Sequence, residues 1–136
     1  MTRSKLIYPC SYCNYPFADT LDHVIPHSYT SVHDKRNYDR SKVVPCCKEC
    51  NTMLGNKMYN TISERAAYLH IRYKQRYKKL LSLPDWSKKE LKQIKGNLKK
   101  KIIFNLNNKE KIELKIEYCS LVRDLEPSIE DIWERL

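Results

Sequence analysis

Glycine is scarce in this chain, which has only two glycines among its 136 residues, Gly55 and Gly96. Two isolated glycines exclude the glycine-rich loops that bind phosphate groups in nucleotide-dependent enzymes. Long hydrophobic runs are also missing, because no stretch approaches the roughly 18 consecutive apolar residues of a membrane span. The first residues contain no apolar run of signal-peptide length. We therefore expect a cytoplasmic protein without a membrane-spanning or secretory segment.

Acidic residues are too few to balance the basic ones, and the formal net charge at pH 7 is +10, with a pI near 9.3. Such an excess indicates a polyanionic partner, and DNA is the one we expect. The excess is concentrated in residues 61–104, which hold 13 basic and 3 acidic side chains, whereas residues 105–136 hold 5 and 8. The alternative is a helix surface that charge merely keeps soluble. The candidate nucleic-acid-binding residues are Arg72, Lys74, Arg76, Lys78, Lys79, Lys88, Lys89, Lys92, Lys95, Lys99, Lys100 and Lys101.

Six cysteines are present, and four of them form two Cys-x-x-Cys pairs in the first half of the chain. Each pair offers two thiolates at a fixed spacing, and four thiolates satisfy the tetrahedral coordination of structural zinc. The alternative is a set of ordinary buried cysteines. This segment has too few apolar residues to close a core unaided, so a metal would supply much of its folding free energy. Cys46 and Cys119 fall outside the spacing and are predicted to be core residues, whereas the predicted zinc ligands are Cys10, Cys13, Cys47 and Cys50.

The organisation of the chain changes near residue 60. Before this point, short apolar runs at residues 21–25 and 42–46 contain β-branched residues, which favour strands. A polar loop separates the two strands, and a helix is predicted to follow Asn51. We therefore divide the chain into a metal-binding module, residues 1–60, and a basic helical extension with an acidic C-terminal tail, residues 61–136.

Apolar residues recur at helical spacing throughout the extension. Capping motifs at Thr61 and Ser87 mark two helix starts, and a bend is expected at Gly96. A polar stretch, Asn105 to Asn108, predicts a break. The expected helices and final turn cover residues 61–83, 87–104, 109–125 and 128–136. Tyrosines are interleaved with the basic residues, and their spacing favours core packing over base stacking; they are Tyr68, Tyr73 and Tyr77.

An Asp-His dipeptide lies between the two cysteine pairs, on the first predicted strand. Adjacent strand residues point to opposite faces, so Asp22 and His23 cannot act as one bidentate group. A division of roles is workable, in which Asp22 binds a divalent ion and His23 faces a water molecule. Phosphodiester hydrolysis needs both, because a base must take a proton from water and a cation must offset the charge that develops on the phosphate. The alternative is a surface pair without a role.

Three motifs together resemble the HNH endonucleases of the zinc-supported ββα-metal type: Cys10-x-x-Cys13, Asp22-His23-Val24-Ile25-Pro26 and Val43-Val44-Pro45-Cys46-Cys47-Lys48-Glu49-Cys50-Asn51. The extension is similar to small HNH proteins of bacteriophages at residues 61–65 and 83–86. The resemblance implies an α+β fold, in which a strand–strand–helix finger braced by a four-cysteine zinc site precedes a mostly helical extension. It also implies that His23 is the general base and that Asp22 and Asn51 ligate Mg²⁺ or another divalent ion.

The sequence departs from the family pattern at one position. The family's middle Asn, which braces the loop behind the general base, corresponds here to Lys42, and Asn37 is a candidate substitute. Two loop histidines, His27 and His33, are candidates for a phosphate contact or a metal ligand, with a solvated loop position as the alternative. His70, within the first long helix, is expected at the surface or at the boundary of the core.

These observations predict a metal-dependent endonuclease that hydrolyses DNA inside a bacterial host cell. The competing hypothesis is a zinc-containing module that docks on nucleic acid, or on a phage or host protein, without cutting; Lys42 is its main support. An RNA substrate is a third hypothesis. One ββα-metal site cuts one strand, so a double-strand break would require a homodimer or two successive visits.

Overall fold

The computed structural model describes residues 8–25 and 40–136. The predictions for His27, His33 and Asn37 lie outside these residues. Two strands precede a series of helices, as the α+β prediction requires. The elements are β1 (Thr20–His23), β2 (Val43–Cys46), α1 (Lys48–Leu54), α2 (Ile62–Arg76), α3 (Lys78–Leu81), α4 (Lys88–Lys92), α5 (Asn97–Leu125) and α6 (Ile129–Glu134).

The two strands form an antiparallel hairpin, within one residue or two of the predicted limits. Its register places Asp22 opposite Val44 and His23 opposite Val43. All four residues of β2 are buried. Helix α6 accounts for part of this burial, because the Trp133 indole donates hydrogen bonds to the carbonyl oxygens of Val43 and Arg40 at 2.9 and 3.0 Å. The acidic C-terminal tail therefore packs on the hairpin.

Helix α1 follows β2 directly and is the third part of a strand–strand–helix unit. Cys47 caps its start with extended backbone, and the Cys47 sulfur accepts a hydrogen bond from the Cys50 amide at 3.4 Å. Gly55 ends the helix at φ 49°, in the left-handed region that favours glycine. The predicted helix after the second strand is present, but it begins at Lys48 and not after Asn51, so Asn51 lies inside it.

Helices α2 and α5 pack side by side and form most of the helical core. Thr61 caps α2 through the Glu64 amide, and Ser87 and Ser128 form complete capping boxes at α4 and α6. These helix starts are confirmed. The predicted helix over residues 61–83 is divided at Tyr77 into α2 and the single turn α3. The buried α2 residues that join the core are Ile62, Ala66, Leu69 and Tyr73, and those of α5 are Ile112, Ile116, Cys119 and Val122.

The predicted break over residues 105–108 is wrong, because α5 runs without interruption for 29 residues. Asn costs only about 0.7 kcal/mol relative to Ala inside a helix, so three of them do not end a helix held by its flanking turns. The discontinuity lies earlier, at the bend predicted for Gly96, where φ is 76°; the predicted helix over residues 87–104 is therefore divided into α4, which ends at Lys92, and the start of α5. On the far side of the asparagines, buried Lys109 donates hydrogen bonds to the Leu83 carbonyl at 2.7 Å and to Asp85 at 2.9 Å.

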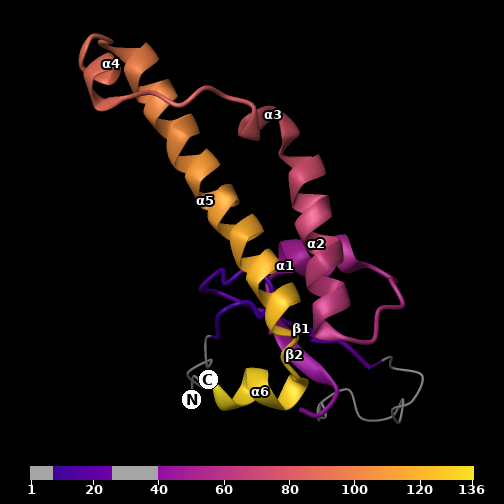
Figure 1. Ribbon diagram of the computed structural model, residues 1–136. Coiled ribbons are helices and arrows are strands. Elements are labelled where there is room, and N and C mark those ends of the chain that lie inside the picture. Colours follow the sequence, from indigo (N-terminus) through magenta and orange to yellow (C-terminus); the bar gives the residue numbers. More distant parts are fainter. Residues whose placement is uncertain (1–7, 26–39) are drawn as a thin grey trace.

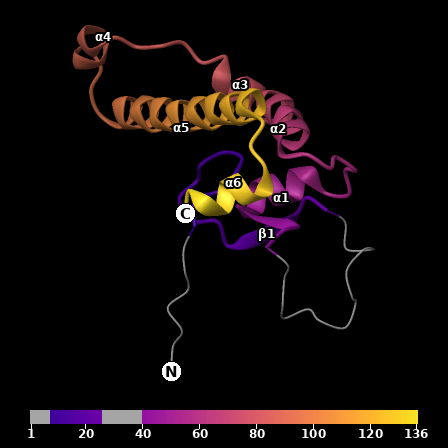
Figure 2. The same cartoon turned by 60° about the horizontal axis from the view of Figure 1, so that its bottom comes forward.

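The molecule has a compact end and a projecting arm. The hairpin, α1 and α6 lie together against one side of the α2–α5 pair, as Figure 2 shows. The first half of α5 and the short α4 extend away from the hairpin (Figure 1). Only the second half of α5 contributes buried residues, from Lys109 onward. At about 1.5 Å per residue, the first twelve residues of α5 carry the arm roughly 18 Å beyond that core.

Candidate functional site

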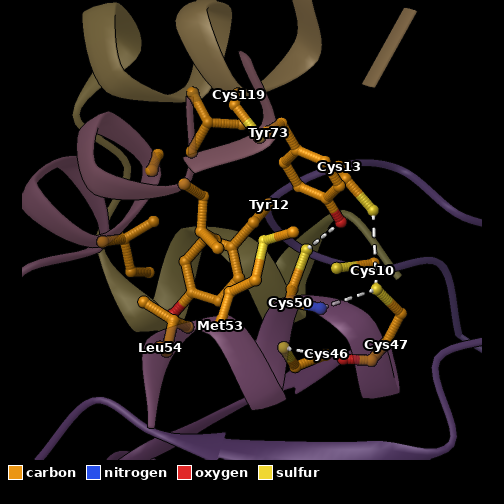
Figure 3. Packing of buried hydrophobic residues seen from close by; sticks show 14 of the residues in the cluster. Cys10, Tyr12, Cys13, Cys46, Cys47, Cys50, Met53, Leu54, Tyr73 and Cys119 are labelled. Atoms are coloured by element: carbon orange, nitrogen blue, oxygen red, sulfur yellow. Dashed lines mark hydrogen bonds between the residues drawn. The ribbon is translucent and has the colours of Figure 1, made fainter. Parts of the chain in front are cut away.

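The first cysteine pair lies in a tight turn before β1. The Asn14 amide donates to the Cys10 carbonyl at 3.0 Å, and the Cys10 amide donates to the Tyr15 carbonyl at 2.7 Å. Asn14 has φ 63°, a left-handed conformation that Asn tolerates better than most residues. This turn directs both cysteine side chains of the pair to one side, toward the start of α1 (Figure 3).

The four paired cysteines meet in one cluster, although the two pairs are far apart in the sequence. Their sulfur atoms all lie within 4.8 Å of one another, and all four residues are buried. The Cys13 and Cys47 sulfurs are 3.6 Å apart. Two thiolates on a tetrahedral zinc ion, with Zn–S bonds of about 2.3 Å, would be about 3.8 Å apart. The cluster therefore has the dimensions of a site for one tetrahedral metal ion.

The two remaining cysteines are core residues, as predicted. Cys46 and Cys119 are fully buried and belong to the hydrophobic cluster that surrounds the four-cysteine group. Burial raises the pKa of Cys119 to about 12, so this thiol stays protonated at neutral pH. Cys46 and Cys119 can therefore be compared with the four clustered cysteines, because they are equally buried but lie outside the group that could bind a metal ion.

A buried tyrosine supports the cysteine cluster from α2. The Tyr73 hydroxyl lies 3.0 Å from the Cys50 sulfur. Burial and the neighbouring Cys50 sulfur raise the pKa of Tyr73, so its phenol remains a neutral donor. A hydrogen bond to a thiolate stabilises its charge and fixes its orientation. Tyr73 is completely buried, and Tyr68 and Tyr77 pack against the same core, in agreement with the predicted packing role.

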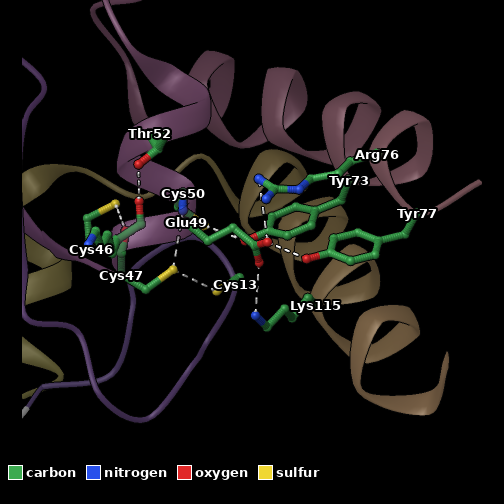
Figure 4. A network of polar contacts seen from close by, with 11 residues as sticks. Cys13, Cys46, Cys47, Glu49, Cys50, Thr52, Tyr73, Arg76, Tyr77 and Lys115 are labelled. Atoms are coloured by element: carbon green, nitrogen blue, oxygen red, sulfur yellow. Dashed lines mark hydrogen bonds and ion pairs between the residues drawn. The ribbon is translucent and has the colours of Figure 1, made fainter. Parts of the chain in front are cut away.

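Glu49, between the two cysteines of the second pair, joins the cluster to both long helices (Figure 4). Its carboxylate lies 3.3 Å from the Lys115 ammonium of α5 and 3.6 Å from the Arg76 guanidinium of α2. It also accepts a hydrogen bond from the Tyr77 hydroxyl. Burial alone would lower the pKa of Lys115, but the nearby thiol groups and Glu49 raise it. Lys115 thus places a positive charge beside a cluster that becomes anionic when its thiols ionise.

Asp22 points into the protein and has three hydrogen-bond donors. Arg65 of α2 donates from Nε to Oδ2 at 2.7 Å and from a terminal nitrogen to Oδ1 at 2.6 Å. The Tyr12 hydroxyl donates to Oδ2 at 2.5 Å. Asp22 and Arg65 are 3% and 4% exposed, and Tyr12 is completely buried. Both oxygens of this carboxylate therefore accept hydrogen bonds from the protein itself.

Sequence reasoning did not identify Arg65 or Tyr12 as part of the site. A signal for Arg65 does exist, since it occupies the same face of α2 as the buried residues Ile62, Ala66 and Leu69. A charged residue on an otherwise apolar helix face requires a buried partner of opposite charge. Its partner, Asp22, lies 43 residues earlier, and helical periodicity does not reveal such a pairing.

The other candidate residues of the hairpin lie nearby. His23 is the last residue of β1 and is half-buried. Asn51, also half-buried, projects from α1 toward β1, where its side-chain amide donates to the Thr20 hydroxyl at 3.4 Å. Thr20 and Asp22 share a face of β1, whereas His23 belongs to the opposite face by alternation. Lys42, which replaces the family's middle Asn, immediately precedes β2.

The predicted nucleic-acid-binding residues form two groups. Those of α2 and α3 lie beside the core, and Arg76 there is paired with Glu49. Those of α4 and the start of α5 occupy the projecting arm. Within residues 8–25 and 40–136, no ion pair involves any lysine of the arm group, which comprises Lys88, Lys89, Lys92, Lys95, Lys99, Lys100 and Lys101. In the same part of the chain, no helix has the length and apolar character needed to cross a membrane.

The fold and the site define a class of protein: an α+β chain with a two-stranded hairpin, a following helix and a four-cysteine cluster at their junction. The family model for HNH endonuclease matches residues 10–57, which contain all of these features. Residues 10–57 therefore form an HNH domain, which covers about a third of the chain. Comparisons with curated proteins and with solved structures gave no match. The helical extension lies outside the family match.

Proposed function

We propose that the protein is a metal-dependent endonuclease that hydrolyses phosphodiester bonds of DNA. The HNH domain carries this proposal, because its hairpin and helix bring Asp22, His23 and Asn51 into one small unit. The basic extension supports it further, since a separate positively charged surface would hold a polyanionic substrate.

His23 is the proposed general base. It terminates β1 at a half-buried position, which allows a side chain to reach both the protein and solvent. A neutral imidazole can accept the proton of an attacking water, and a base in this role typically contributes about 10²–10⁴-fold to the rate. The chain has no other histidine within the hairpin strands, so His23 is the residue to replace in a test.

Asp22 and Asn51 are the proposed ligands of a divalent cation. A carboxylate and an amide oxygen are hard donors of the kind that Mg²⁺ and Mn²⁺ prefer, so the donor set fits such an ion chemically. When bound, the ion would stabilise negative charge on the scissile phosphate. Asn51 is held near β1 by Thr20. Asp22, by contrast, is engaged by Arg65 and Tyr12 in this conformation, and it would have to exchange Arg65 for the cation.

The four-cysteine cluster is proposed to hold a structural zinc ion. Four sulfur donors leave no coordination position for water or substrate, which distinguishes a structural zinc site from a catalytic one. The cluster joins the turn before β1 to the start of α1, and thus links the segments that precede and follow the hairpin. Zinc would hold the hairpin residues in place without taking part in the chemistry.

The arm is proposed to grip the DNA backbone at a distance from the hairpin. Helix α5 has 29 residues, which corresponds to about 43 Å. Since each base pair of B-DNA rises about 3.4 Å, this length matches about 13 base pairs. The lysines of the arm would contact phosphates roughly one helical turn from the scissile bond. Such contacts add affinity without reading the base sequence.

A second candidate function is nucleic-acid binding without cleavage. One specific observation favours it: the carboxylate assigned to the cation already has a buried cationic partner, Arg65. A domain that keeps the HNH fold but has lost its cation would show this kind of replacement. Lys42 at the middle-Asn position agrees with the same interpretation.

A plasmid-nicking assay separates the two functions. The wild-type protein is incubated with supercoiled DNA and Mg²⁺, Mn²⁺ or EDTA, and duplex and single-stranded RNA serve as alternative substrates. We expect metal-dependent nicking of DNA that His23→Ala abolishes while DNA binding and zinc content remain. His70→Ala, on a helix outside the HNH domain, is the matched control and should still nick. DNA binding without nicking under any metal condition would favour the binding module.

A further inference from the structure

Arg65 holds the one carboxylate that the proposed cation site requires. Its planar guanidinium meets both oxygens of Asp22, at 2.6 and 2.7 Å, in the two-pronged geometry that Arg forms with carboxylates. A third donor of the same guanidinium contacts the Tyr59 carbonyl at 2.7 Å. Tyr59 belongs to the connection between α1 and α2. Arg65 is thus held in place by three hydrogen bonds and shielded from water.

Arg65 lies outside the segment that matches the HNH family. The HNH family match ends at residue 57, eight residues before Arg65. The guanidinium therefore comes from the helical extension and reaches back into the domain. Tyr12, which donates to the same carboxylate, comes from inside the domain, between the first two cysteines. Burial and the charge of Asp22 raise the pKa of Tyr12 well above its usual value, so its phenol remains a donor to Asp22.

A divalent cation and Arg65 cannot share this carboxylate. A cation coordinates through the oxygen lone pairs, and three donors already take three of the roughly four lone pairs of a carboxylate that is 3% exposed. Charge leads to the same conclusion, because an ion placed at Asp22 would lie against a buried guanidinium of like sign. Tyr12 is neutral and can rotate its hydroxyl, so Arg65 is the group that excludes the ion.

We propose that Arg65 is a built-in competitor for the catalytic cation: the protein folds with its cation site closed by the helical extension, and an ion binds at Asp22 only where Arg65 has withdrawn. This inference rests on the proposed function, since it concerns the same Asp22 carboxylate. It makes Arg65 a positioning residue that controls whether the site can be loaded. The connection that contains Tyr59 is the segment whose movement would withdraw it.

The consequence is measurable as an apparent affinity. When only a fraction of the molecules is competent to bind, the apparent dissociation constant is the intrinsic one divided by that fraction. If Arg65 blocks the cation site at Asp22 in at least nine of every ten molecules, then removing Arg65 lowers the apparent dissociation constant of the ion about tenfold or more. The effect must also depend on Asp22, because Arg65 acts through that carboxylate alone.

Mn²⁺ binding to the zinc-loaded full-length chain tests the proposal, with titration followed by electron paramagnetic resonance. We expect Arg65→Gln to bind Mn²⁺ at least about tenfold more tightly than the wild type. Lys111→Gln removes the same charge from an exposed position on α5, outside the nucleic-acid-binding set, and should bind Mn²⁺ like the wild type. Adding Asp22→Asn to Arg65→Gln should abolish the gain. Equal affinity of the wild type and Arg65→Gln, or a gain that survives Asp22→Asn, overturns the proposal.

Two further variants keep the test decisive if Arg65→Gln folds poorly, as judged by circular dichroism and zinc content. Arg65→Lys retains the charge but replaces a fork with a single ammonium, which cannot hold both oxygens equally well. We expect it to bind Mn²⁺ more tightly than the wild type, and a folded variant with wild-type affinity contradicts the proposal. Tyr12→Phe leaves Arg65 in place and should show no gain. None of these measurements requires nicking, so a failure here is distinct from a failure of the His23→Ala assay.

Discussion

Loss of one ligand from the four-cysteine cluster should unfold the HNH domain. We consider Cys13→Ser, which removes one of four buried sulfurs that lie within 4.8 Å of one another. The cluster links segments 34 residues apart, because it joins the turn before β1 to the start of α1. Structural zinc typically supplies about 10–16 kcal/mol of apparent binding free energy in small zinc domains at pH 7. The free energy of unfolding of a whole domain is usually only about 5–15 kcal/mol, so the domain is not expected to stay folded without the metal.

The assay compares metal content with folding. The wild type should contain one zinc per chain by elemental analysis and should unfold cooperatively on heating, as monitored by circular dichroism. Cys13→Ser, or the wild type treated with a strong zinc chelator, should lose the zinc and the cooperative transition. Part of the helical signal should persist, because α2 and α5 also pack against each other outside the cluster.

The other two cysteines provide matched controls. Cys46 and Cys119 are buried as completely as the four clustered cysteines but lie outside the cluster. Cys46→Ala and Cys119→Ala should retain one zinc per chain and lose about 1 kcal/mol, the usual effect of a single substitution. A zinc-free Cys13→Ser protein that melts like the wild type would refute the reasoning. Zinc loss in Cys119→Ala equal to that in Cys13→Ser would refute it as well.

Two further predictions concern the surroundings of the cluster and the arm. Tyr73→Phe removes the hydroxyl that lies 3.0 Å from the Cys50 sulfur. We expect the zinc affinity, measured in competition with a coloured chelator, to fall about 10–100-fold, while the variant still binds zinc when protein and metal are equimolar. An unchanged affinity would show that this hydroxyl has no effect on the metal. Replacing the three lysines at residues 99–101 with Gln should weaken the salt dependence of binding to a DNA duplex. The slope of log K, the association constant, against log salt concentration should become less negative by up to about 0.9 for each phosphate that the protein no longer neutralises. Fluorescence anisotropy at several salt concentrations measures this slope, and an unaltered slope would place the DNA elsewhere.

Features that depend on near neighbours in the sequence were predictable. The spacing within each Cys-x-x-Cys pair follows from the geometry of one tight turn, and both pairs were predicted as ligands of one ion. Thr61, Ser87 and Ser128 act on amides only three residues away, so a short motif suffices to locate each helix start. The two cysteine pairs, the motif around Asp22 and His23, and the run from Val43 to Asn51 together predicted the HNH domain.

Features that depend on competition between local signals were less predictable. The asparagines of residues 105–108 have a weak preference against helix, but continuous backbone hydrogen bonding on both sides outweighs it. The bend predicted at Gly96 is present, but α4 already ends at Lys92, and Gly96, with its positive φ, is the residue before α5. The length of the arm follows from this one difference between a break and a continuous helix.

The sequence by itself determined the class of the protein, because cysteine spacing, capping motifs and the Asp-His dipeptide each act over a few residues. Only the tertiary structure decided what surrounds those groups. It pairs Asp22 with Arg65 across 43 residues and joins Glu49 to Lys115 across 66. A buried charge requires a partner, but no local rule specifies which distant residue supplies it. The fold makes that choice, and here it brings the helical extension into contact with the proposed catalytic carboxylate.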